Sequence, residues 1–235
     1  SMGKCLFSGA PISFDYLKQQ GEKGSIGLTL VGYVTYGPGG RRYYAGTPSQ
    51  QDLGLAATPA DPCDLELPER ALGFRVRPYG ITTWGQLFLP RQQLALETFA
   101  GLVAEVPKWV QEEGGDEQYG RYVATYLGLA VGKLAQFNSS QSLWKIDSRN
   151  GVGKPEGAFG RNDLPMTWDF VEANPFGGSV GDWSRVVETS LSALKYVSPS
   201  GPRTIVEQGD ARTAGTRVGG EALVARDAPY SLRQS

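Results

Sequence analysis

The sequence predicts a mixed α/β fold that combines a partial open sheet, a mainly helical insertion and an N-terminal β-hairpin. Residues 27–46 alternate apolar and polar side chains around a Gly-Pro-Gly-Gly turn, which indicates a β-hairpin. Residues 91–138 carry apolar side chains at helical spacing. Residues 204–211 and 221–230 are short apolar runs that each include an acidic residue, as at the carboxyl ends of strands in a doubly wound sheet.

Composition limits the possible chemistry. The 235 residues can bury one substantial core, and no stretch is apolar enough to span a bilayer. The chain has no histidine, which excludes Ser-His-Asp and Cys-His catalysis and imidazole zinc sites within it. Two cysteines and no export signal predict reduced thiols in the cytoplasm, and we expect no metal site and no membrane partner. A net charge of -1 creates no overall attraction for nucleic acid, so any DNA contact must come from local patches.

The remaining elements follow in chain order. We expect residues 1–70 to hold the hairpin and an irregular linker at 47–69, and residues 72–76 to form one short strand. Residues 71–162 would be the helical insertion and residues 163–235 a partial catalytic core. Helices are predicted at 91–113, which Pro107 would kink or end, at 116–138 with Asp116 as cap, and at 184–197 with Asp182 as cap. A polar loop at 138–161 separates the second helix from the third.

Two short motifs lie 17 positions apart near the end of the chain. Asp227-Ala228-Pro229-Tyr230 resembles the Asp/Asn/Ser-Pro-Pro-Tyr/Phe/Trp tetrapeptide of DNA amino-methyltransferases. A carboxylate and a proline-held carbonyl can accept hydrogen bonds from an exocyclic amine, and an aromatic ring can stack on the flipped base. Gly209-Asp210-Ala211 resembles the strand tip whose acid contacts the cofactor adenine in S-adenosylmethionine-dependent enzymes. Taken alone, each motif is also typical of an ordinary turn.

A longer resemblance covers nearly the whole chain. Residues 159–176, FGRNDLPMTWDFVEANPF, are similar to a string in bacterial and archaeal adenine-specific DNA methylases that carry a zinc ribbon and a domain of unknown function. Residues 87–96, 126–127 and 138–140 match further landmarks in the same order, and residues 4–16 resemble the stretch after the ribbon. Ala228 stands where the family has a second proline, and residues 231–235 depart from its continuation.

The resemblance implies a Rossmann-like DNA adenine N6-methyltransferase that uses S-adenosyl-L-methionine. Asp227, Pro229 and Tyr230 would then be the catalytic residues, and Asp210 and Ala211 would contact the cofactor. The family's glycine-rich cofactor loop lies upstream of the matched region, so the chain is expected to be an inactive piece of the enzyme when isolated. The alternative is a nucleic-acid-binding or interaction module without chemistry of its own, and a third possibility is a purely structural domain.

Other candidates have a functional and a structural interpretation. Asn174 and Phe176 open a glycine-rich stretch that resembles a cofactor loop, but it is also typical of a tight turn that caps the third helix. Trp168, Asp169 and Glu172 would line a cleft or form an aromatic packing cluster with exposed acids.

Candidate DNA contacts are concentrated in the hairpin. Arg41 and Arg42 precede two tyrosines, a mixture suited to phosphate contact and base stacking or to a solvated hairpin. Arg161 is a further predicted DNA contact, and Arg91, Arg149 and Lys154 are weaker candidates.

Overall fold

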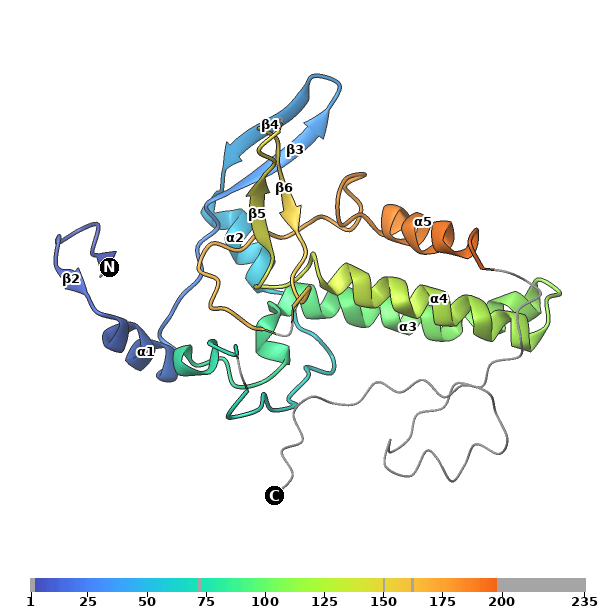
Figure 1. The fold of residues 1–235 in the computed structure, drawn as a ribbon, viewed down its shortest axis with the longest axis horizontal. Helices are drawn as coiled ribbons and strands as arrows, with labels where there is room; N and C mark the ends of the chain where they lie inside the picture. The colour runs from blue at the N-terminus through green and yellow to red at the C-terminus, as the bar shows by residue number, and fades with distance from the viewer. Residues whose placement is uncertain (1–2, 72, 150, 162, 198–235) are drawn as a thin grey trace. The chain divides into compact units, whose positions relative to one another are not determined.

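A computed structural model describes residues 3–71, 73–149, 151–161 and 163–197 (Figure 1). Within these ranges the protein is mixed α/β, with five α-helices and three separate two-stranded antiparallel sheets. The chain divides into two units, Ser1–Lys195 and Tyr196–Ser235, and only Tyr196 and Val197 of the second are described. Among the described residues, no helix combines the length and apolar character needed to cross a membrane.

The three sheets are hairpins. They pair β1 (Gly3–Lys4) with β2 (Pro11–Ile12), β3 (Gly32–Gly37) with β4 (Gly40–Ala45), and β5 (Leu143–Ile146) with β6 (Gly153–Glu156). The second confirms the hairpin predicted from residues 27–46. A Rossmann-like sheet would need the strands expected at 204–211 and 221–230, which lie outside the described residues.

Two long helices lie side by side, α3 (Pro90–Glu112) and α4 (Glu117–Ala135) (Figure 1). Both begin as the sequence predicts, because Pro90 occupies the first turn of α3 and the Asp116 carboxylate accepts from two amides of α4. Pro107 does not end α3, which continues to Glu112. The helices approach closely there, since a Cβ on Gly120 would lie 2.8 Å from the Pro107 Cα.

The third predicted helix is α5 (Trp183–Leu194), and its cap is confirmed: the Asp182 carboxylate accepts from the Arg185 amide at 3.2 Å. It packs on α4. The burial of the apolar stripe predicted for α4 changes along the helix. Ala130 and Leu134 are fully buried, whereas Tyr122 and Tyr126 near the other end are exposed.

Four local elements differ from the prediction. Residues 47–69, expected to be irregular, contain α2 (Pro48–Leu55), which starts with a capping box between Thr47 and Gln50. The polar loop at 138–161 contains β5 and β6. Instead of the short strand expected at 72–76, the described residues there form an isolated parallel bridge from Phe74 to Leu164. A further helix, α1 (Phe14–Glu22), was not predicted; it starts at Ser13, whose hydroxyl accepts from the Tyr16 amide.

The apolar core joins the segment before α3 to the segment that carries the family-like string. Buried side chains from both pack together, with several aromatic rings around them: Leu67, Val76, Leu87 and Leu164, surrounded by Phe74, Ile81, Trp84, Phe88, Phe159 and Met166. Two short 3-10 turns, η1 (Arg77–Tyr79) and η2 (Gly85–Leu87), shape the first segment. Much of the 159–166 string therefore serves packing.

A polar cluster ties the start of α3 to the later segment. The Glu172 carboxylate accepts hydrogen bonds from Arg91 Nε at 3.0 Å and from Gln92 Nε2 at 2.7 Å, and it forms an ion pair with Arg91 Nη2 at 2.9 Å. The Ser140 amide and hydroxyl both donate to the Leu87 carbonyl oxygen at 2.8 Å. These bonds hold residues 138–173 against the helical pair, and so set the point from which β5 and β6 project.

Candidate nucleic-acid interface

The register of the β3–β4 hairpin divides its side chains between two faces. Tyr36 pairs with Arg41 and Val34 with Tyr43, so these four share one face. The next residues along each strand point the other way, and there Tyr33 and Tyr44 stack with ring centroids 5.2 Å apart. Arg42, opposite Thr35, lies on this second face. The two arginines predicted to act together therefore point in opposite directions.

The first face, called here the Arg41 face (Val34, Tyr36, Arg41 and Tyr43), meets the β5–β6 hairpin. Arg41 Nη1 donates to the carbonyl oxygen of Gly153 at the start of β6. Among the described residues, the Gly153 carbonyl oxygen is the hydrogen-bond partner of the Arg41 guanidinium. The bond fixes the direction of a side chain that has five N–H donors. The remaining donors stay available at the edge of the hairpin pair.

A hollow of about 440 Å³ lies between the two hairpins. Its lining comes from the Arg41 face on one side and from the β5–β6 loop on the other: Tyr36, Arg41, Tyr43, Gly151 and Val152. Tyr36 is 74% exposed and Tyr43 64% exposed, so neither ring is used to build the core. The volume falls within the usual range of small-molecule sites, about 300–1,000 Å³.

The charged side chains of the two hairpins are mainly positive and only partly neutralised. On β5–β6, Lys145 pairs with Glu156 at 2.7 Å and Arg149 pairs with Asp147 at 3.4 Å. The amide and guanidinium of Arg149 hold the pKa of Asp147 below its ordinary value, so this carboxylate stays ionised at neutral pH. Among the described residues, Arg42 and Lys154 form no ion pair. Within the described ranges, the two hairpins thus carry unpaired cations besides Arg41, with Arg42 on the face of β3–β4 that points away from the hollow.

The lack of a side chain at Gly153 allows the two hairpins to meet in this way. A Cβ built on it would lie 2.3 Å from Trp144 Nε1, so the indole covers the glycine directly. We expect Gly153→Ala to displace the indole and to weaken the Arg41 contact, at a cost of about 1–3 kcal/mol in stability. The measurement is the indole N–H resonance of Trp144, which should shift.

Gly160→Ala is the matched control, because a Cβ there meets nothing within 4 Å. An unchanged Trp144 resonance in Gly153→Ala would show that the indole does not pack on this glycine.

The other predicted DNA contacts lie elsewhere. Arg91 is held by Glu172, so it belongs to the cluster that fastens the fold. Arg161 is exposed, and no hydrogen bond or ion pair among the described residues joins it to either hairpin. Trp168 packs edge-on against Tyr79 with ring centroids 5.2 Å apart. The packing interpretation accounts for Trp168, while Glu172 is an ion-pair partner rather than an exposed acid.

The stretch that contains Asn174 and Phe176 forms a turn before α5. Asn174 Oδ1 accepts from the Phe176 amide at 2.9 Å, and the Phe176 ring lies 5.9 Å from that of Phe99. The Asp182 carboxylate already accepts from the Gly178 and Arg185 amides, so it occupies the amide groups that an anionic ligand would use at this helix end. The turn interpretation explains these contacts, and a cofactor role for Asn174 and Phe176 stays a prediction.

The predicted catalytic and cofactor residues at the end of the chain, Asp210, Ala211, Asp227, Pro229 and Tyr230, lie outside the described residues. Cys5 and Cys63 are both free, and the described residues contain no group of three or more potential metal-binding side chains. A hydrogen bond from the Ser8 side chain, followed by the Ser8 and Phe7 amides, lowers the pKa of the Cys5 thiol.

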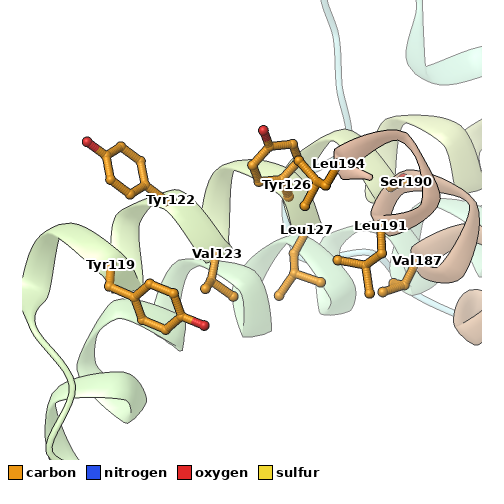
Figure 2. A pocket seen from close by; sticks show the side chains of 9 residues that line it. All are labelled: Tyr119, Tyr122, Val123, Tyr126, Leu127, Val187, Ser190, Leu191 and Leu194. Carbon is orange, nitrogen blue, oxygen red and sulfur yellow. The ribbon is translucent and has the colours of Figure 1, made fainter. Parts of the chain in front are cut away.

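A second hollow, of about 250 Å³, lies between α4 and α5 (Figure 2). Figure 2 shows leucines and valines of the two helices along it, with Tyr119, Tyr122 and Tyr126 on α4. Ser190 is its only other polar side chain, and the Ser190 hydroxyl donates to the Val186 carbonyl within α5. With no ionisable group other than the tyrosine hydroxyls, this hollow offers apolar contact and little chemistry.

No protein-family model, curated protein or solved structure matches the chain. The functional argument therefore depends on the geometry of the hairpin pair and on the motifs in the sequence. Sequence reasoning named Arg41 and Tyr43 as candidates but not Tyr36, which lines the same hollow. The signal was present, because the turn between Gly37 and Gly40 places Tyr36 directly opposite Arg41.

Proposed function

We propose that this chain binds DNA through the hairpin pair, as part of an S-adenosyl-L-methionine-dependent DNA adenine N6-methyltransferase. The observation that carries DNA binding is the Arg41 face beside β5–β6, where a positioned guanidinium lies next to two exposed tyrosines. Arginine and lysine contacts to phosphates supply most of the sequence-independent affinity of DNA-binding proteins. Exposed aromatic rings add stacking to bases.

Methyl transfer is supported by the sequence alone, through the family-like strings at 87–96 and 159–176 and the Asp227–Tyr230 tetrapeptide. S-adenosyl-L-methionine would supply the methyl group, and the Rossmann-like sheet belongs to the same proposal. Among the described residues, Asn174 and Phe176 are the predicted cofactor contacts, although the Asp182 carboxylate already accepts from the Gly178 and Arg185 amides beside them. The cytoplasmic location expected from composition fits an enzyme that acts on bacterial or archaeal DNA.

The DNA-binding proposal is tested with a charge variant of the hairpins. Arg41→Gln, Arg42→Gln and Lys154→Gln together remove three cations, and we expect a loss of at least about tenfold in DNA affinity, since a hydrogen bond to a charged group contributes about 1.5–3 kcal/mol. Fluorescence anisotropy with a labelled oligonucleotide measures it.

The control removes three other cations, each paired with an acid inside a helix: Lys18→Gln, Lys108→Gln and Arg121→Gln. Its net charge equals that of the hairpin variant, so equal losses in both would indicate nonspecific charge attraction and contradict a hairpin site.

The non-catalytic alternative keeps the same DNA surface and differs only in the cofactor. Calorimetry with S-adenosyl-L-methionine separates the two, on this chain and on any longer form of the protein. Binding by the longer form supports the methyltransferase, whereas DNA binding without cofactor binding in either form supports the simple binding module.

A further inference from the structure

We infer that the hollow between the two hairpins takes an unpaired nucleobase, so that the chain prefers single-stranded DNA to duplex. The inference rests on the proposed DNA binding and assigns a ligand to one part of that surface. It concerns three side chains of the Arg41 face, Tyr36, Arg41 and Tyr43, and the glycine-rich backbone of the β5–β6 loop across from them.

The geometry of the rings is the first argument. Tyr36 and Tyr43 lie on the same face of β3–β4, diagonally across the two strands, and this spacing brings large side chains within reach of each other. On the opposite face, the rings of Tyr33 and Tyr44 stack on each other. Tyr36 and Tyr43 are the more exposed pair and line a hollow, so their faces are open to an added planar group.

The position of Arg41 is the second argument. Its bond to the Gly153 carbonyl holds the guanidinium at the wall of the hollow, next to the Tyr36 ring with which it is paired across the hairpin. Its remaining N–H groups can donate to acceptor atoms on a base edge or to the phosphate of the same nucleotide. Every base offers such acceptors, so the site needs no particular sequence.

The third argument is access. In duplex DNA the faces of the bases are covered by their neighbours, and only their edges are open in the grooves. Stacking on protein rings therefore requires a single strand or a base turned out of the helix. A hollow lined by two exposed tyrosines and Arg41 matches an unpaired base, whereas the base faces of a duplex would stay covered.

The test compares the wild-type chain with a variant carrying Tyr36→Leu and Tyr43→Leu. Binding is measured with a fluorescein-labelled single strand and with the duplex of the same sequence. We expect the wild type to prefer the single strand, and the variant to lose about 5- to 100-fold in single-strand affinity while duplex affinity stays within about twofold. Tyr44→Leu, on the opposite face of the same strand, is the matched control and should leave the preference intact.

A second measurement reports stacking directly and does not depend on affinity. A single strand that contains 2-aminopurine should lose fluorescence on saturation with the wild type or with Tyr36→Phe and Tyr43→Phe, which keep the rings. The 2-aminopurine fluorescence should not fall when the strand is saturated with the variant that carries Tyr36→Leu and Tyr43→Leu. Equal affinity for both DNA forms, or no effect of the tyrosines, overturns this inference but leaves DNA binding standing. Absence of binding to either DNA form overturns the proposed function as well.

Discussion

Glu172→Ala should lower the free energy of unfolding by about 2–4 kcal/mol. The Glu172 carboxylate receives one hydrogen bond from Arg91 and one from Gln92, and it also forms an ion pair with Arg91 in which the Glu172 and Arg91 side chains are 29% and 31% exposed. The Gln92 residue is 1% exposed, so its amide group would lose a partner that water cannot easily replace. Chemical denaturation, monitored by circular dichroism, measures the change in the free energy of unfolding.

Glu156→Ala is the matched control, because it also removes a glutamate from an ion pair. Glu156 pairs with Lys145 at 2.7 Å, but both side chains are about half exposed, at 46% and 56%. Exposed pairs contribute about 0–1 kcal/mol, so this variant should be nearly as stable as the wild type. If Glu172→Ala and Glu156→Ala lower the free energy of unfolding by the same amount, the polar cluster at the start of α3 does not stabilise the fold.

The second large effect is expected at Gly21, inside α1. A Cβ on Gly21 would lie 2.3 Å from the Tyr79 carbonyl oxygen, and one on Gly80 would lie 2.1 Å from the Gly21 oxygen. The helix therefore docks on η1 with backbone against backbone. Alanine normally stabilises a helix relative to glycine by about 1 kcal/mol, but here overpacking should reverse the sign and cost about 1–3 kcal/mol.

Limited proteolysis measures this local effect, because a helix that leaves its docking site opens to the protease. In Gly21→Ala we expect faster tryptic cleavage at Lys18 and Lys23 than in the wild type. Gly27→Ala is the control, since a Cβ there meets nothing within 4 Å. Unchanged cleavage in Gly21→Ala would mean that α1 does not dock through this glycine.

Helices α3, α4 and α5 could be predicted from the sequence because their signals are local, whereas α1 and α2 were missed. Asp116 and Asp182 cap α4 and α5, and both bonds are made within the first turn of the helix concerned. Pro107 was predicted to kink or end α3, and it does not end the helix, which packs closely there against Gly120 of α4. This contact joins two helices, so it is not visible in a local pattern.

The β5–β6 hairpin could not be predicted, because part of its support comes from a residue distant in sequence. Its strands are four residues each, and one contains a proline, so propensity favours a loop. What holds it is the Trp144 indole over Gly153 and the bond from Arg41, which is 112 positions earlier in the chain. The same contact decides that Arg41, rather than Arg42, faces the hollow.

The salt dependence of DNA binding tests the central claim most directly, because it counts the phosphate contacts made by the hairpins. The slope of log affinity against log salt concentration should be negative for the wild type, and each phosphate contact contributes about 0.7–0.9 to its magnitude. Removing Arg41, Arg42 and Lys154 should reduce that magnitude by about 0.7–0.9 for each of the three that contacts a phosphate, while the helix-cation control leaves it unchanged. An equal slope for the wild type and the hairpin variant would contradict DNA binding at this surface.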